Sequence, residues 1–595
     1  MMTPPRHSPH SSSLKQKRFL ICLLLISIPS LIIVIIISAK HQKPPLVGTA
    51  LSDDHNNNNN NVHEKKGTKP AWFDVIAKGI KEEKIKIGLV NIQDDEELVG
   101  SLHHHLHPKV ETLTVNFDHV NESLKWEELY PEWIDENERW GKPKCPEMAM
   151  AAAKDDMNVV VARVPSCGVR DVFRLQVNLV VANLAVENGW VSWVEFDHRV
   201  VYVVFVGSSS SCGPMEEIFR CDDLLMHNNN NNNHNQQGGY YWVYKPDLRS
   251  LKHKTLMPIG SCQIAPAYAE PGKEIWRWRP EKKQNSSTTL SPNARTAYVT
   301  ILHSSELYVC GAISLAQSII QNPDKDTHRL HETKDLVLLA DDSITSESLT
   351  ALKAAGWNKI KRIQRIRSPF AKKSSYNEWN YSKLRIWELT MYEKIIFLDS
   401  DVLVLKSIHG FFYYPQLSAA PNEKAMFNSG VMVIEPSQCM FENMLDKIHK
   451  VKSYNGGDQG FLNEVFTWWH RTPSKLNKLK TFRSNNSGNH DDDDEIPEDL
   501  YTIHYLGLKP WMCYRDYDCN WDKEEYRMFA SDLAHQKWWQ VYDAMPKELQ
   551  SYCGLSKKMD QRIVKWRRIA MNDSTFDAHS KIQVKDPRRN NYPVA

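Results

Sequence analysis

Hydrophobic positions in the second half of the chain alternate between two periodicities. Residues 297–302 and 335–340 are short apolar runs of the kind that form buried strands. Each run is followed by apolar side chains at helical spacing, which are Val309, Ile313, Ala316 and Ile320 after the first run, and Leu349 and Leu352 after the second. A less regular strand is expected at residues 360–366. Alternating strands and helices specify a mainly parallel sheet covered on both faces, so we predict an α/β domain over residues 291–530.

A smaller α/β pattern precedes this domain, over residues 156–290. Five apolar residues share one face of a predicted helix that ends at Gly189, and they are Val172, Leu175, Leu179, Ala182 and Val186. Strand-like runs follow at residues 191–196 and 199–206. Since no pattern here indicates catalytic chemistry, we interpret residues 156–290 as an accessory α/β region.

The most apolar stretch of the chain is residues 19–39. It carries no charge and has about the length, ~20 residues, that crosses a bilayer as a helix. The basic residues that precede it are Arg6, Lys15, Lys17 and Arg18. The positive-inside rule therefore predicts a cytosolic tail (1–18), a signal anchor (19–39) and a lumenal remainder, which is a single-pass type II topology. A cleaved signal peptide is the alternative, but its apolar core is shorter.

The flanking segments are polar or aromatic. Residues 40–155 are predicted to be a stem and flexible region, with an asparagine run at 56–61 and clustered histidines that lack regularly spaced partner ligands. Residues 531–595, which include Trp538 and Trp539, are predicted to form an extension that packs on the core. Lysine plus arginine number 74 against 72 acidic residues, so net charge gives no reason to expect a nucleic acid partner.

Cysteines and glycosylation sequons agree with a lumenal location. All but one of the 11 cysteines lie beyond residue 39, where disulfides are permitted in this topology. Cys513 and Cys519 are close enough in sequence to pair, but pairing with other cysteines is equally open. The N-glycosylation sequons begin at Asn121, Asn285, Asn380, Asn485 and Asn572.

Two acidic residues follow a strongly apolar run at residues 395–398. Asp399 and Asp401 have one residue between them, and because side chains at i and i+2 of a strand share one face, both carboxylates are expected to point the same way. Ligands in open α/β sheets bind at the carboxyl ends of such strands, and paired carboxylates suit a divalent cation that holds a diphosphate. The bare pattern is weak, because Asp516 and Asp518 repeat it elsewhere. Its position after a buried strand makes it a candidate site.

Four strings together resemble the glycogenin-like retaining glycosyltransferases of family 8. These strings are LDSDV with Asp399 and Asp401, FNSGVMV with Asn428, NGGDQGFLN with Asp458 and Gln459, and HYLGLKPW with His504, Gly507 and Lys509. The longer strings HYLGLKPWMCYRDYDCNWD and KSSYNEWNYSKLRIWEL are similar to those of the plant UDP-glucuronate:xylan α-glucuronosyltransferases. The resemblance implies a GT-A nucleotide-sugar-binding fold, with a Rossmann-like, mixed and mainly parallel sheet.

The resemblance also implies roles for individual residues. Asp399, Asp401 and His504 would bind Mn²⁺, for which carboxylate and imidazole ligands with open positions are suitable. Lys383, Asp458 and Gln459 are the implied catalytic residues. The implied donor-binding residues are Asp399, Ser400, Asp401, Asn428, Ser429, Gly430, Asn455, Gly456, Gly457, Asp458, Gln459, His504, Tyr505, Leu506, Gly507, Leu508 and Lys509. Lys509 would place its ammonium on the leaving diphosphate.

Further positions carry weaker expectations. Thr300, Leu302 and Tyr308 resemble the uridine-binding segment of the family. Arg385 has a planar fork that could pair with the carboxylate of a glucuronate donor. Four tryptophans could offer flat faces to a sugar chain, although core packing is favoured for them, and they are Trp468, Trp469, Trp511 and Trp521.

The resemblance implies a Golgi membrane enzyme. It would move glucuronic acid from UDP-glucuronate to the 2-hydroxyl of xylan xylose residues with retention, forming an α-1,2 linkage in glucuronoxylan of the secondary cell wall. Expected partners are the donor, the xylan acceptor, the Golgi membrane through one helix, and other xylan-synthesis enzymes. The alternatives are a self-glucosylating starch or glycogen primer, against which the anchor argues, and a catalytically silent scaffold, against which the intact motifs argue.

Overall fold

The computed structural model describes residues 70–92, 99–100, 102, 109–130, 151, 156–165, 168–189, 199–207, 213–228, 240–256, 295–323, 334–423, 425–482, 496–572 and 582–590. The chain divides into two compact units, Met1–Lys65 and Lys66–Ala595, and the first lies outside these residues. The predicted anchor at 19–39 therefore also lies outside them. Among the helices that are described, none is both long and apolar enough to span a membrane.

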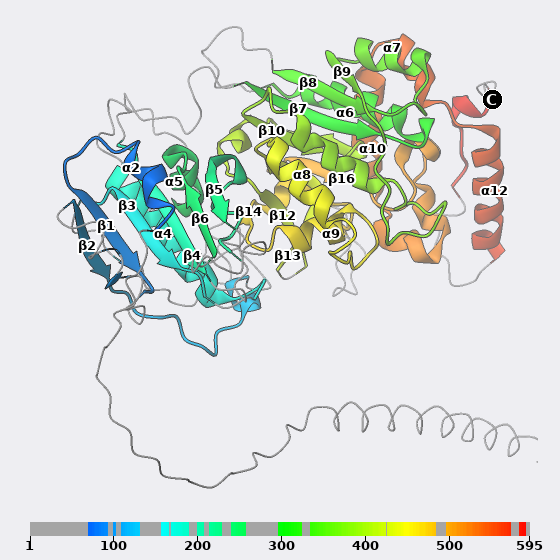
Figure 1. Cartoon of the computed structure of the whole chain (residues 1–595). Helices are drawn as coiled ribbons and strands as arrows, with labels where there is room; N and C mark the ends of the chain where they lie inside the picture. Colours follow the sequence, from blue (N-terminus) through cyan, green and yellow to red (C-terminus); the bar gives the residue numbers. More distant parts are fainter. Residues whose placement is uncertain are drawn as a thin grey trace, which may run out of the picture. The chain divides into compact units, whose positions relative to one another are not determined.

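The accessory region forms a six-stranded sheet in the order β2-β1-β3-β4-β6-β5 (Figure 1). Its strands are β1 (Ile85–Val90), β2 (Val110–Val115), β3 (Val159–Arg163), β4 (Tyr202–Gly207), β5 (Leu224–Asn228) and β6 (Tyr240–Tyr244). Strands β2, β1, β3 and β4 are parallel, and β6 runs antiparallel to both β4 and β5. The folded region begins earlier than the sequence predicted, because β1 and β2 fall within the segment assigned to the stem.

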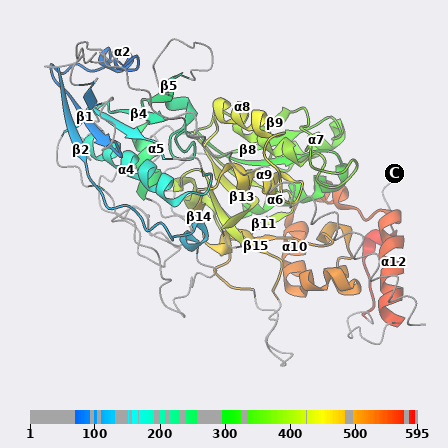
Figure 2. The same ribbon diagram turned by 60° about the horizontal axis from the view of Figure 1, so that its bottom comes forward.

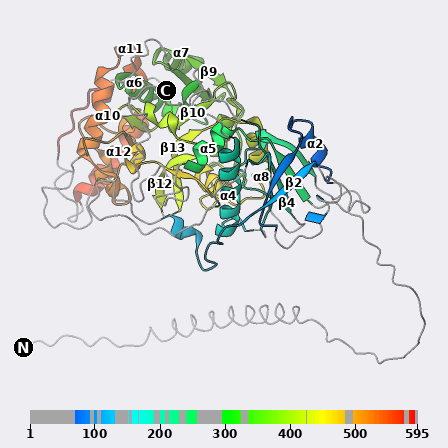
Figure 3. The ribbon, with the colours of Figure 1, turned by 90° about the vertical axis from the view of Figure 1, so that its left-hand side faces the viewer.

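The predicted helix of this region is α4 (Val172–Gly189), which is buried along almost its whole length. It packs on β3 and on α5 (Leu248–Leu256), as Figure 3 shows from the side of this sheet. The short helix α2 (Phe73–Ala77) contributes Phe73 and Ile76 to the core. The predicted strand at 191–196 lies outside the described residues.

The second sheet has seven strands in the order β14-β12-β13-β10-β7-β8-β9. They are β7 (Thr296–Leu302), β8 (Asp335–Ala340), β9 (Lys359–Arg362), β10 (Lys394–Leu398), β12 (Ser418–Glu423), β13 (Met426–Ile434) and β14 (His470–Arg471). Strands β10, β7, β8 and β9 are parallel, and β13 is antiparallel to β10 and β12. The predicted mixed, mainly parallel α/β sheet is therefore confirmed, although β9 ends at Arg362 rather than at residue 366.

Helices cover this sheet as the hydrophobic spacing requires. Helix α6 (Val309–Gln321) buries Val309, Ile313 and Ala316, but Ile320, next to its last residue, is 51% exposed. The other helices are α7 (Ser346–Ala354), α8 (Gln438–Lys447) and α9 (Asp458–Val465), the last of which packs on β13 (Figure 2). The segment around Lys383 is a 3-10 helix, η4 (Asn380–Glu388), rather than an α-helix.

A small third sheet joins distant parts of the chain. It consists of β11 (Val402–Val404), β16 (Thr502–His504) and β15 (Lys478–Leu479). In its antiparallel ladder Val402 pairs with His504. This pairing brings the segment after β10 next to the histidine of a motif far along the chain.

The C-terminal extension packs on the core, as predicted. Its helices are α10 (Asp532–Ala544), α11 (Lys547–Gln550) and α12 (Lys557–Asn572). Trp538 and Trp539 are buried in the same hydrophobic cluster as Ile313 of α6. A disulfide between Cys310 and Cys553 fastens this extension to α6.

Contacts between the two large sheets hold the accessory region in place. A disulfide joins Cys221 to Cys439 of α8, and Arg220 forms an ion pair of 3.2 Å with Glu435. The Tyr130 ring stacks on Trp469 with 5.2 Å between centroids. Because one hydrophobic cluster includes residues of both sheets, the accessory region shares a core with the second sheet.

Candidate active site

The acidic motif lies in a turn after β10. All five residues of β10 are buried between β7 and β13, so the strand is fixed up to Leu398. A hydrogen bond of 3.0 Å from the Val402 amide to the Asp399 carbonyl then closes a turn. The carboxylates of Asp399 and Asp401 therefore approach each other through this turn, and not through the alternation of a strand that the sequence suggested.

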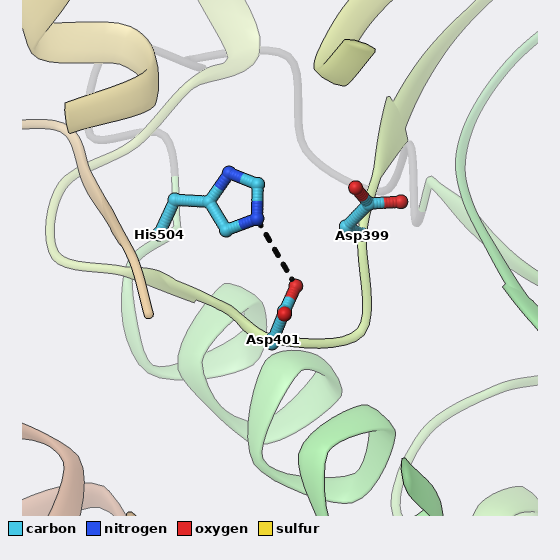
Figure 4. Close-up of side chains that lie close together, drawn as sticks. All are labelled: Asp399, Asp401 and His504. Carbon is cyan, nitrogen blue, oxygen red and sulfur yellow. Dashed lines mark ion pairs between the residues drawn. The ribbon is translucent and has the colours of Figure 1, made fainter. Parts of the chain in front are cut away.

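His504 completes a group of three metal-type ligands. One ligand atom each from Asp399, Asp401 and His504 lies within 4.8 Å of the others. Figure 4 shows the His504 ring facing the Asp401 carboxylate, with Nε2 3.2 Å from Oδ1 and Asp399 beside them. The other ring nitrogen, Nδ1, lies 3.1 Å from Oδ1 of Asn477. Two carboxylates and one oriented imidazole are a donor set that suits a divalent cation such as Mn²⁺.

Gly430 is required for the position of the His504 ring. A Cβ atom at residue 430 would lie 2.4 Å from Cε1 and 2.6 Å from Nδ1 of His504. The neighbouring Asn428 side chain accepts hydrogen bonds from the Gly430 amide at 2.8 Å and from Nδ2 of Asn477 at 2.9 Å. The FNSGVMV string thus leaves room for the His504 ring at Gly430 and, through Asn428, orients the Asn477 side chain that contacts this ring.

We expect Gly430→Ala to abolish most transferase activity, because the new methyl group displaces His504. Overpacking of this kind costs about 1–3 kcal/mol of stability. Gly410→Ala is the matched control, since a Cβ atom there has no heavy atom within 4 Å. Sugar transfer and thermal unfolding of both variants test this expectation. Normal transfer by Gly430→Ala would show that the ring need not stay where it is.

Lys509 is the second residue that contacts the Asp401 carboxylate. Its Nζ lies 2.6 Å from Oδ2 of Asp401 and also donates to the Tyr505 carbonyl. Burial alone would raise the pKa of Asp401, but Lys509 and His504 hold that pKa well below its usual range. Burial likewise opposes the charge of Lys509, and the Asp401 carboxylate outweighs it and raises the lysine pKa. This part of the site therefore keeps a carboxylate and an ammonium charged side by side.

The turn before Lys509 places few side chains for a donor. Gly507 has a positive φ of 68°, and a Cβ there would lie 2.4 Å from Oδ1 of Asn520. Tyr505 is buried, with its hydroxyl donating to the Ala534 carbonyl at 2.7 Å, and Leu508 is buried too. Of the predicted donor contacts in this string, the Tyr505 and Leu508 side chains face the core, and Leu506 is half-buried.

Lys383 sits between two carboxylates on the other side of the site. Its Nζ lies 3.0 Å from Oδ1 of Asp399 and 2.6 Å from Oδ2 of Asp458, and it donates to the Ser429 carbonyl at 3.2 Å. Ser429 donates from Oγ to Oδ2 of Asp458 at 2.8 Å. Burial raises the pKa of Asp399 to about 6, although the Lys383 charge acts in the opposite direction. The structure therefore brings Lys383, Asp399, Ser429 and Asp458 together.

Glycines shape the loop that carries Asp458 and Gln459. Gly456 has a positive φ of 71°, and the Asn455 side chain accepts a hydrogen bond of 2.9 Å from the Gly457 amide. Helix α9 then begins at Asp458. Gln459 accepts from the Ser429 amide at 3.2 Å and donates to the Tyr454 hydroxyl at 2.8 Å. The predicted Asn455–Gly457 turn thus orients both candidate catalytic side chains.

The structure shows what the side chains of the weaker candidates contact. Thr300 is fully buried, with Oγ1 donating to the Leu398 carbonyl at 2.7 Å, and Leu302 is buried as well, so neither side chain can reach uridine. Tyr308 is half-buried and lies against Trp511. Arg385 pairs with Glu388 at 2.8 Å and lies over the Phe441 ring, and these contacts already engage its guanidinium.

Core packing is confirmed for the four tryptophans, which are 0–5% exposed: Trp468, Trp469, Trp511 and Trp521. The exposed aromatic rings near the site are Tyr376 and Tyr454, 74% and 50% exposed. Asn377 donates to the Asn455 carbonyl at 2.8 Å, so the two loops that carry these rings touch. Sequence reasoning missed both tyrosines, because an isolated tyrosine in a polar loop gives no signal.

Sequence reasoning also missed a set of groups at the ends of the neighbouring strands. His303 follows β7, Asp341 follows β8, and Arg365 comes three residues after β9. Asp341 lies 3.2 Å from Nε of Arg365 and accepts from the Ser304 amide at 3.1 Å. Burial lowers the pKa of His303 to about 4, so this imidazole is neutral at ordinary pH. Their common position at the carboxyl edge of a parallel sheet was the available signal.

The parallel sheet, the ligand group at its carboxyl edge and the paired lysines define a nucleotide-sugar-dependent glycosyltransferase. Two family descriptions match the chain, "GUX1-5 N-terminal domain" over residues 62–262 and "Glycosyl transferase family 8" over residues 299–416 and 415–513. In Arabidopsis thaliana, "Putative UDP-glucuronate:xylan alpha-glucuronosyltransferase 4" is 50% identical over 540 residues, covering 88% of this chain and 90% of the relative. The chain belongs to the UDP-glucuronate:xylan alpha-glucuronosyltransferase family, within glycosyltransferase family 8.

A second relative also matches most of the chain. "UDP-glucuronate:xylan alpha-glucuronosyltransferase 2" of Arabidopsis thaliana is 43% identical over 529 residues, covering 87% of this chain and 82% of the relative. The galactosyltransferase LgtC, solved with donor and acceptor sugar analogues, is 18% identical with a TM-score of 0.31, covering 43% of this chain and 99% of its own. A TM-score this low supports no inference about the present chain.

Proposed function

We propose that the protein transfers glucuronic acid from UDP-glucuronate to the 2-hydroxyl of xylose residues in xylan, with retention and Mn²⁺ dependence. The observation that carries the proposal is the meeting of the Asp399, Asp401 and His504 group with Lys509 on one side and the Lys383–Asp458 pair on the other. The names of the family relatives supply the donor and the acceptor. We also propose that the seven-stranded sheet belongs to a GT-A nucleotide-sugar-binding fold.

The residues on the two sides of the metal group have different proposed roles in transfer. Mn²⁺, when bound to Asp399, Asp401 and His504, would neutralise charge on the diphosphate. Lys509, as a fixed ammonium beside this group, stabilises negative charge on the leaving UDP. Lys383 holds Asp399 and Asp458 in place. Asp458 and Gln459, the first two residues of α9, would lie beside the sugar ring. An oxygen near C1 stabilises the positive charge that develops there during transfer.

Two exposed tyrosine rings near the candidate site would provide a stacking surface for the acceptor. Tyr454 is 50% and Tyr376 74% exposed, and the Tyr454 hydroxyl accepts a hydrogen bond from the Gln459 side chain. Sugar rings stack on aromatic faces through their apolar C–H surfaces. A xylan chain lying over these rings would bring one hydroxyl to the donor.

The direct test is an assay of the purified lumenal portion with three donors. UDP-glucuronate, UDP-glucose and UDP-galactose are each incubated with xylo-oligosaccharides, with Mn²⁺ or with excess chelator. We expect transfer from UDP-glucuronate alone, dependence on the metal, and an α-1,2 linkage by NMR of the product. Transfer of glucose to the protein itself would instead support a primer, and transfer from none of the donors would support a scaffold.

We further propose a Golgi type II location, with residues 19–39 as the anchor and other xylan-synthesis enzymes as neighbours. In this topology, we expect glycans on Asn121 and Asn572, which are exposed, and none on Asn380. Asn380 is half-buried in η4 beside Lys383, and Ser382 of its sequon is fully buried. Glycosidase treatment followed by peptide mapping distinguishes these sites. Bare Asn121 and Asn572 in cells, with protease access in intact vesicles, would contradict the topology.

A further inference from the structure

We propose that Arg365 binds the C6 carboxylate of the donor sugar and sets the preference for UDP-glucuronate over UDP-glucose. The inference rests on the proposed function, because it needs a donor that carries this carboxylate. Glucuronate differs from glucose only in that anionic group, so a selective site requires a fixed cation there. Arginine suits this task, since its planar fork matches a carboxylate with two parallel hydrogen bonds.

Arg365 lies at the edge of the sheet where the candidate site is built. Strands β10, β7, β8 and β9 are parallel, so the residues after each of them meet at one edge. Asp399 follows β10, His303 follows β7, Asp341 follows β8, and Arg365 follows β9. This placement puts Arg365 in the same row as the candidate metal ligands.

The Arg365 side chain is held rigidly through one of its edges and one of its faces. Its Nε lies 3.2 Å from Oδ2 of Asp341, and its guanidinium lies over the Trp379 ring, 4.4 Å from the centroid. Asp341 is itself only 2% exposed and is fixed by the Ser304 amide and by Oγ of Ser343. A guanidinium fixed in this way loses little conformational entropy when it binds a ligand.

The outer edge of the guanidinium remains open. Nη1 and Nη2 of Arg365 make no hydrogen bond to any residue in the described part of the chain, and the side chain is 39% exposed. Four donor hydrogens on these two nitrogens therefore have no acceptor among the described residues. A bidentate carboxylate would satisfy two of them without displacing any protein partner.

Electrostatics connect Arg365 to the catalytic side of the site. The His303 imidazole experiences the charges of Asp341 and Asp458, and also those of Lys383 and Arg365. Trp379, on which Arg365 stacks, directly precedes η4, the element that carries Lys383. His303 is thus close enough to Arg365 and to the Lys383–Asp458 pair for the charges of both to act on it.

Other cations close to the site are already engaged. Lys383 has its ammonium against Asp399, Asp458 and Ser429. Lys509 contacts Asp401 and the Tyr505 carbonyl and is assigned to the diphosphate.

The neighbouring arginines are engaged as well. Arg385 pairs with Glu388, and Arg367 pairs with Glu378 at 3.0 Å. Arg362 donates to the carbonyls of Asp341 and Ile344. Unlike these groups, Arg365 is held by Asp341 and Trp379 while its two Nη nitrogens have no hydrogen-bond acceptor among the described residues.

The test measures donor preference in Arg365→Gln and Arg365→Lys, with Arg367→Gln as the matched control. Arg367 lies two residues away and also pairs with a carboxylate, but at 50% exposure and with no contact to Asp341. Charged hydrogen bonds of this kind correspond to about a tenfold to hundredfold change in binding. We therefore expect Arg365→Gln to lower the ratio of kcat/KM for UDP-glucuronate to that for UDP-glucose by roughly this factor. Arg365→Lys should restore part of the ratio, and Arg367→Gln should leave it unchanged.

A calorimetric titration without acceptor separates this inference from the proposed function. Mn²⁺-loaded wild type and variants are titrated with UDP-glucuronate, UDP-glucose and UDP. Weaker binding of UDP-glucuronate alone in Arg365→Gln supports the inference, even if the wild type fails to glucuronidate xylo-oligosaccharides and the proposed function falls. An unchanged preference in Arg365→Gln, equal loss of all three ligands, or a wild type without preference would overturn it. If Arg365→Gln does not fold, Arg365→Lys decides by the same criteria.

Discussion

Asp401→Asn is expected to lower glucuronosyl transfer by about a thousandfold, because it removes one charged ligand from the Asp399, Asp401 and His504 group. The carboxamide keeps the shape of the side chain but not its charge. It also leaves Lys509 without its buried counter-charge, so the variant should be less stable by roughly 3–5 kcal/mol. Transfer must therefore be measured below the unfolding temperature of the variant.

The control for Asp401→Asn removes the other half of the same ion pair. Lys509→Met loses a comparable buried interaction but retains all three metal-type ligands. Because a ligand that binds the folded state raises its stability, Mn²⁺ should raise the Tm of the wild type and of Lys509→Met, but not of Asp401→Asn. If Mn²⁺ raised the Tm of Asp401→Asn as much as that of the wild type, or if excess chelator left wild-type transfer undiminished, the assignment of the metal site would be contradicted.

Lys383→Met is expected to lower kcat by on the order of a hundredfold to a thousandfold and to cost roughly 3–5 kcal/mol of stability. The ammonium of Lys383 lies between the carboxylates of Asp399 and Asp458, all three largely buried. Without it, two like charges face each other and the orientation of Asp458 is lost. Chemical denaturation and transfer kinetics at saturating donor measure the two effects.

Arg385→Gln is the comparison for Lys383→Met, since both residues lie on η4. Arg385 pairs with Glu388 at a distance from the ligand group, and such ion pairs contribute about 0–1 kcal/mol. We expect its kcat and its glucuronate-to-glucose preference to match the wild type. If Arg385→Gln impaired transfer as strongly as Lys383→Met, the division of η4 into a site-facing and an outward-facing side would be wrong.

Much of the second sheet follows from local hydrophobic pattern. The run at 335–340 coincides with β8, and the predicted inner face of α6 is buried apart from Ile320 at its end. The pattern is sufficient here because each element must bury its apolar side chains against the same sheet. The extent of the accessory sheet was less predictable. Strands β1 and β2 are isolated short runs within polar sequence, and only their parallel pairing with β3 identifies them.

The candidate site shows the same division more sharply. The position of Asp399 and Asp401 after a buried strand was enough to nominate these two residues for metal and diphosphate chemistry. His504, Lys383 and Asp458 were nominated by the resemblance of their motifs to family 8. The distances between these residues could not be predicted from the sequence, because Asp401 and His504 meet only through the pairing of Val402 with His504 in the small sheet.

The direction in which each side chain points was decided by tertiary structure alone. Arg385 and Arg365 are both cations near the same motif, yet Arg385 is held by Glu388 while Arg365 is held by Asp341 and Trp379 with its fork open. Thr300 turned out to hold β7 to β10 instead of facing a ligand. Local periodicity reports which face of an element is apolar, and it carries no information about which distant charge or ring a polar side chain will meet. For this protein the sequence therefore determined the elements and the chemical groups, and the packing of strands far apart in the chain determined which of those groups act together.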